Sequence, residues 1–183
     1  MGESLYVNFK QLTSSGVTKL AGMIQNLIFV MNEQVERHTE LYGLSLEEKD
    51  AIVQNDVETL QKLVNLKNMV ITQNNRLEKQ RLSLVSDIAE VLGLADKDIS
   101  FSELIEIMEG KPEQEELRVV GKRLKDIVEQ LKGINDLNKS LLESSLEFVE
   151  YSLNALRSTI EPEPVDIPTT TGRRGNGANV YDA

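Results

Sequence analysis

Apolar residues recur at helical spacing along most of the chain. They follow one another in steps of three and four residues, which places their side chains on one side of a helix. No segment alternates apolar and polar residues between hairpin turns, as a half-buried strand would. The pattern therefore predicts an all-α protein: an antiparallel bundle of three long helices, with a short extra helix before the last one and coiled-coil-like packing.

Residues with capping preferences separate the predicted helices. Asn55 suits a left-handed helix end, and Asp56 suits the N-cap of the next helix. Ser100 and Glu103 have the spacing of a capping box. The predicted helices cover residues 17–54, 57–92, 101–109 and 113–160.

Each long helix carries one main apolar stripe. Gly43 is expected to weaken the first helix. Lys67 and Arg81 can extend their stems along apolar neighbours, and one asparagine in a stripe can fix the register of a helix pair. The stripes comprise Ile24, Ile28, Met31, Val35, His38 and Tyr42 in the first helix, Leu60, Leu63, Lys67, Val70, Asn74, Leu77, Arg81, Leu84, Ile88 and Val91 in the second, and Leu117, Val120, Leu124, Ile127, Leu131, Ile134, Asn138, Leu141, Ser145 and Phe148 in the last.

Both ends of the chain lack this periodicity. Residues 1–16 have no basic start and no long apolar centre, so we expect a flexible leader and not a secretion signal. Residues 161–183 are rich in proline, threonine, arginine and glycine, which predicts a disordered tail. Residues 17–160 are then predicted to form a single helical bundle.

The composition narrows the possible functions. Twenty Lys and Arg residues against thirty Asp and Glu residues give a net charge of −10, which opposes binding to nucleic acid or to an anionic membrane surface. No apolar run approaches the length of a membrane span, so no membrane insertion is expected. The chain has no cysteine, which excludes disulfides and thiolate chemistry and is compatible with a reducing cytosol.

The single histidine, His38, lies on the apolar stripe of the first helix. Its neighbours four residues away are Gln34 and Tyr42, which are not metal ligands. A core histidine is therefore the better interpretation, and a catalytic base or a ligand the weaker one.

One segment resembles the start of a calcium-binding loop. Asp96, Asp98 and Ser100 match its first oxygen positions, but Phe101 stands where the loop needs glycine and Ile107 where it needs glutamate. The sequence also lacks a phosphate-binding glycine loop and a nucleophile elbow. We therefore predict no enzyme activity, no catalytic residue, no metal site and no cofactor.

The last predicted helix has more apolar surface than one partner helix would cover. A second stripe lies beside the main one, and we name five of its residues the C-terminal strip: Leu142, Leu146, Val149, Leu153 and Leu156. Two interpretations stay open. Either the first two long helices cover both stripes, or part of this surface binds another polypeptide.

Residues 135–149, with the sequence NDLNKSLLESSLEFV, are similar to the C-terminal helix of the FlgN-like flagellar export chaperones. The asparagines three residues apart, the leucine pair and the Ser-Leu-x-Phe-Val segment carry this resemblance. Residues 54–60, QNDVETL, resemble the first interhelical turn of that family. The resemblance covers roughly residues 20–160.

This resemblance implies a cytoplasmic chaperone of the flagellar type III secretion system. Such a protein would bind hook-associated (hook-filament junction) proteins, prevent their premature assembly and deliver them to the export apparatus. The resemblance places cargo binding on the C-terminal strip. The alternative is a structural coiled-coil protein that uses the same surface to form a homodimer and has no client.

Overall fold

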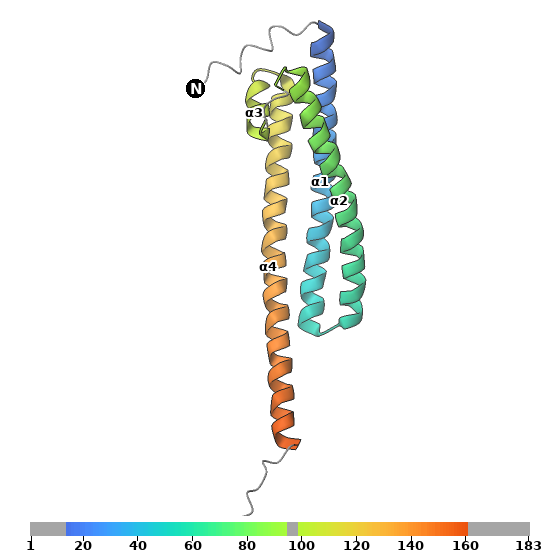
Figure 1. Cartoon of the computed structure of the whole chain (residues 1–183), viewed down its shortest axis with the longest axis vertical. Coiled ribbons are helices and arrows are strands. Elements are labelled where there is room, and N and C mark those ends of the chain that lie inside the picture. Colours follow the sequence, from blue (N-terminus) through green and yellow to red (C-terminus); the bar gives the residue numbers. More distant parts are fainter. Residues whose placement is uncertain (1–13, 95–98, 161–183) are drawn as a thin grey trace, which may run out of the picture. The chain divides into compact units, whose positions relative to one another are not determined.

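The computed structural model describes residues 14–94 and 99–160 (Figure 1). These residues contain no strand, so the all-α prediction is confirmed. The predicted tail, most of the predicted leader, and Asp96 and Asp98 of the rejected calcium loop lie outside the described residues. The helices are α1 (Ser14–Gln54), α2 (Val57–Val91), α3 (Phe101–Ile107) and α4 (Pro112–Ile160).

The contacts divide the chain into two compact units, Met1–Ser144 and Ser145–Ala183. The first unit contains α1, α2, α3 and the part of α4 that ends at Ser144. The second unit, within the described residues, is the remainder of α4 up to Ile160.

A short turn joins α1 to α2, and the two helices lie side by side (Figure 1). Asn55 has a φ of 55°, the left-handed conformation that its sequence position predicts. The Asp56 carboxylate accepts a hydrogen bond from the Thr59 backbone N–H at 3.0 Å, so the predicted N-cap is confirmed. The chain therefore reverses within two residues, and α2 runs back along α1.

The helix α1 continues without interruption through Gly43, so the low helix propensity of this glycine does not end the helix. Leu41 and Ser45, on either side of Gly43, are both buried. The packing of these side chains outweighs the roughly 1 kcal/mol by which glycine disfavours a helix.

The short helix α3 packs against the first turns of α4. The Ser100 hydroxyl accepts from the Glu103 backbone N–H at 3.2 Å, and the Glu103 carboxylate accepts from the Ser100 N–H at 2.8 Å, which completes the predicted capping box. The Gln114 side-chain amide of α4 donates to the Ile105 carbonyl of α3 at 3.2 Å. Leu104 of α3 is buried.

One cluster of buried residues joins all four helices of the first unit. Each large side chain in such a core stabilises the fold by about 1.5–3 kcal/mol relative to an exposed position. This cluster fixes the position of the first turns of α4 against α1, α2 and α3. Its buried members are Leu20, Ile24, Leu27, Ile28, Met31, Val35, Ile88, Leu92, Leu94, Leu104, Met108, Leu117 and Val120.

The predicted main stripes face inward in the first unit, where every stripe residue is buried or half-buried. In the second unit the prediction fails at Phe148, which is 70% exposed. Every residue from Leu146 to Thr159 except Ser152 is exposed, so Phe148 is exposed because the described residues cover no face of this part of α4.

Candidate functional site

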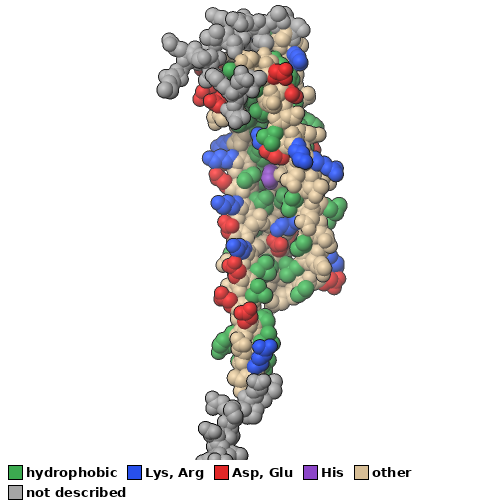
Figure 2. Space-filling model, viewed as in Figure 1, with side chains coloured by type: hydrophobic (Ala, Val, Ile, Leu, Met, Phe, Trp, Pro, Cys, Tyr) green, Lys and Arg blue, Asp and Glu red, His purple; other side chains and the backbone are tan. Residues whose placement is uncertain are grey.

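The C-terminal strip is exposed along its whole length. Leu142 belongs to the first unit, and the other four residues belong to the second. Leu146, the most exposed of them, presents 64% of its surface. Steps of three and four residues keep the strip on one face of α4, and at 1.5 Å per residue its last four members extend over about 15 Å. Figure 2 shows hydrophobic side chains on the surface of this last part of α4.

Two exposed aromatic residues lie on the other side of the same part of α4. Phe148 and Tyr151 are both largely exposed. The helical periodicity places Phe148 on the main stripe and gives Tyr151 no role, although an aromatic residue directly after Glu150 breaks the polar face of the helix. Contiguous exposed apolar surface on a folded protein commonly marks an interaction site, so this end of α4 is the strongest candidate for a binding surface.

A partly buried polar layer connects α1 and α2 inside the first unit. Gln34, which is 2% exposed, donates to Glu78 Oε2 at 2.9 Å. Arg81 donates to both oxygens of the same carboxylate, at 2.8 Å and 2.6 Å. These arginine hydrogen bonds are the main cause that lowers the pKa of Glu78.

His38 lies next to this layer. Burial lowers the pKa of its imidazole, and the nearby Glu78 carboxylate acts in the opposite direction. Glu78 is therefore held ionised by Arg81, while His38 is held neutral. This arrangement pairs charges within the bundle and offers no free acid and base for catalysis.

A second polar layer joins α1, α2 and α4. Lys67 Nζ lies 2.7 Å from Glu48 Oε2. Asn138, which is 3% exposed, donates its side-chain amide to the same Glu48 oxygen and to the Ser45 carbonyl, both at 2.8 Å. The Ser45 hydroxyl donates to Asn135 Oδ1 at 3.0 Å. Because buried polar groups must find partners, these contacts favour one register of α4 against α1.

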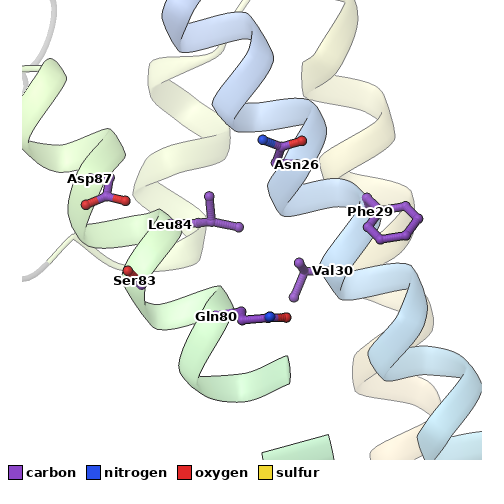
Figure 3. A pocket seen from close by; sticks show the side chains of 7 residues that line it. All are labelled: Asn26, Phe29, Val30, Gln80, Ser83, Leu84 and Asp87. Atoms are coloured by element: carbon purple, nitrogen blue, oxygen red, sulfur yellow. The ribbon is translucent and has the colours of Figure 1, made fainter. Parts of the chain in front are cut away.

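A shallow groove lies between α1 and α2 (Figure 3). Val30 from α1 and Leu84 from α2 point toward each other, whereas the Phe29 ring points away. Asp87 is the one charged residue that lines the groove, so it offers a single carboxylate and no second group for acid–base chemistry. The lining residues are Asn26, Phe29, Val30, Gln80, Ser83, Leu84 and Asp87.

Two further findings concern the kind of site that the molecule can hold. The described residues contain no group of three or more His, Cys, Asp and Glu side chains placed to hold a metal ion. Within residues 14–94 and 99–160, no helix combines the length and the hydrophobicity that a membrane span requires.

An exposed apolar helix end is a common feature of proteins that bind other polypeptides. The comparison with known families agrees: a family profile described as FlgN protein matches residues 23–176. The chain belongs to the FlgN family, whose members are flagellar export chaperones and not enzymes. The match extends past residue 160, where we expected the resemblance to end. No curated protein and no solved structure matches the chain.

Proposed function

We propose that this protein is a cytoplasmic flagellar type III secretion chaperone that binds hook-associated proteins, prevents their premature assembly and delivers them to the export apparatus. The observation that carries this proposal is the exposed C-terminal strip in a chain of the FlgN family. The main cargo contacts are assigned to Leu142, Leu146, Val149, Leu153 and Leu156.

In this proposal an amphipathic segment of the cargo lays its apolar face along the strip. The strip residues are about half exposed, so covering each contributes on the order of 1 kcal/mol. Ordering a cargo segment that was free before binding costs several kcal/mol, so the strip by itself gives only a weak affinity. Such an affinity suits a chaperone that must release its cargo for export.

The rest of the chain would act as a rigid support for this surface. We propose that residues 17–160 form a three-helix antiparallel bundle with coiled-coil-like packing, flanked by a flexible leader and tail. The hydrogen bonds from Asn138 to Ser45 and Glu48 support this arrangement, because they join α4 to α1 far from the core cluster.

The test replaces two leucines of the strip with aspartate. Leu146→Asp with Leu153→Asp places two charges on the apolar face, and we expect cargo affinity to fall by more than about tenfold. Affinity is measured by calorimetry with purified hook-associated proteins. Leu82→Asp on α2 is the matched control, because Leu82 is also exposed, at 54%, but lies outside the strip. Unchanged cargo binding by the double variant would show that the strip is not the cargo site.

The same variants separate this proposal from the alternative, a structural homodimer without a client. Sedimentation of the protein alone gives its oligomeric state. A stable dimer that the double variant dissolves, together with no binding of hook-associated proteins by the unmodified chain, would favour the homodimer.

A further inference from the structure

The part of the C-terminal strip in the second unit follows a coiled-coil repeat. Leu146 and Leu153 are one heptad apart, and Val149 and Leu156 repeat at the same interval. They occupy the a and d positions of a heptad, which is the narrow spacing that one partner helix covers. The strip therefore fits a single amphipathic helix and is too narrow for a broad globular surface.

One edge of this strip is charged. Glu150 and Arg157 occupy the e positions beside it, one heptad apart, and both are exposed. They are separated by about 10.5 Å along the helix axis. Within the part of the chain that the structure describes, neither has an ion pair. Both charges are therefore available to a partner.

The opposite edge is uncharged. Ser152 and Thr159 occupy the g positions. The Ser152 hydroxyl donates to the Phe148 carbonyl at 2.8 Å, and the Thr159 hydroxyl donates to the Ala155 carbonyl at 2.9 Å. These side chains satisfy their hydrogen bonds within their own helix. Because serine and threonine carry no charge, the two edges of the strip differ in charge.

We propose that the strip selects a cargo helix by this one-sided charge pattern. The helix carries a heptad apolar stripe, a basic residue opposite Glu150 and an acidic residue opposite Arg157. Charges at the edges of a helix pair set partner choice and orientation. The pattern thus fixes both the register and the direction of the cargo helix. This inference rests on the proposed function and adds the chemistry of the partner to it.

A second copy of this chain fits the pattern less well. In an antiparallel pair that matches all four apolar residues, e positions face e positions. Glu150 then meets the second copy's Glu150 and the two repel each other, whereas Arg157 faces the second copy's Glu143, which is also an e position. In a parallel pair, e positions face g positions, where Ser152 and Thr159 carry no charge. Neither arrangement of two copies therefore gives Glu150 an opposite charge, whereas the proposed cargo helix pairs both Glu150 and Arg157.

The test uses two designed helical peptides, each about three heptads long, with leucine at a and d. The first carries lysine opposite Glu150 and glutamate opposite Arg157, and the second has these two charges exchanged. We measure their binding to the full chain by fluorescence anisotropy. The first peptide is expected to bind about tenfold more tightly at low salt, with a smaller preference at high salt because exposed charges are screened.

The variant that exchanges the two charges, Glu150→Lys with Arg157→Glu, keeps the net charge and should invert the preference. Glu147→Lys is the control, because Glu147 lies on the side of α4 away from the strip and should leave the preference unchanged. An unaltered preference in the exchanged variant, or no binding of either peptide to the unmodified chain, overturns the inference.

The outcome also shows which claim has failed. If the leucine-to-aspartate variant loses cargo while the exchanged variant shows no change with cargo or peptides, only the charge pattern is wrong. If the leucine-to-aspartate variant keeps cargo, the proposed cargo site itself is wrong. A stable dimer of the unmodified chain that the leucine variant dissolves would assign the strip to a second copy.

Discussion

Two glycines of α4 allow the packing of α3 to be tested. A Cβ atom built on Gly121 would clash with the Phe101 ring, because it would lie only 3.0 Å from the Cζ atom, closer than van der Waals contact allows. A Cβ atom built on Gly133 would meet nothing within 4 Å. Both residues lie in the interior of the same helix, so Gly121→Ala and Gly133→Ala form a matched pair.

The helical preference alone favours both substitutions, because alanine is about 1 kcal/mol better than glycine in a helix interior. Gly133→Ala should therefore raise the free energy of unfolding by up to about 1 kcal/mol. At Gly121 the new methyl group must displace the Phe101 ring, which packs against the core cluster. Overpacking of this kind costs about 1–3 kcal/mol, so Gly121→Ala should lower the free energy of unfolding by about 1 kcal/mol.

Urea unfolding followed by circular dichroism measures both variants, and the slope of the transition checks that the unfolding reaction has not changed. Adding Phe101→Leu gives a double-mutant cycle, in which the smaller side chain should recover most of the loss at Gly121. Equal stabilisation by the two alanine variants would refute the reasoning, since it would mean that the Phe101 ring moves aside without cost.

Three further predictions concern the polar groups of the first unit. Burial lowers the pKa of His38 below its ordinary 6.5, so the unfolded chain binds a proton more readily than the folded one. Stability should then fall as the pH drops through that value, and His38→Gln should flatten this part of a melting-temperature profile. Asn138→Ala removes two hydrogen bonds of a buried amide and should lower the free energy of unfolding in urea by about 2 kcal/mol. The same substitution at the exposed Asn154 should change it little. Ser100→Ala removes the capping box of α3 and should cost about 1 kcal/mol by the same measurement.

Features set by neighbouring residues could be predicted from the sequence. The turn at Asn55 and Asp56 and the capping box of Ser100 and Glu103 depend on groups within a few positions of one another. The inward stripes of the first unit follow from helical periodicity in the same way. These features need no knowledge of which helices meet.

The polar layers could not be predicted, because their partners are far apart in the sequence. The sequence identifies Asn138 as a polar residue within an apolar stripe, but its hydrogen bonds reach Ser45 and Glu48, about ninety positions away. Nothing in the local pattern around Lys67 indicates that its ion pair is with Glu48. Such pairings depend on the register between helices, which is a property of the folded chain.

The C-terminal strip poses a different problem, because periodicity shows which residues share a face but not whether anything covers that face. Leu141 and Leu142 are adjacent and chemically identical, yet Leu141 is half-buried and Leu142 is exposed. An exposed leucine adds little to folding stability, since its side chain meets water in the folded and unfolded states alike. Stability therefore does not account for an exposed row that includes Leu146 and Leu153, whereas the proposed cargo binding would. It follows that Leu146→Asp with Leu153→Asp should shift the melting temperature by no more than the Leu82→Asp control while it weakens cargo binding, and a large loss of stability would instead show that these leucines serve the fold.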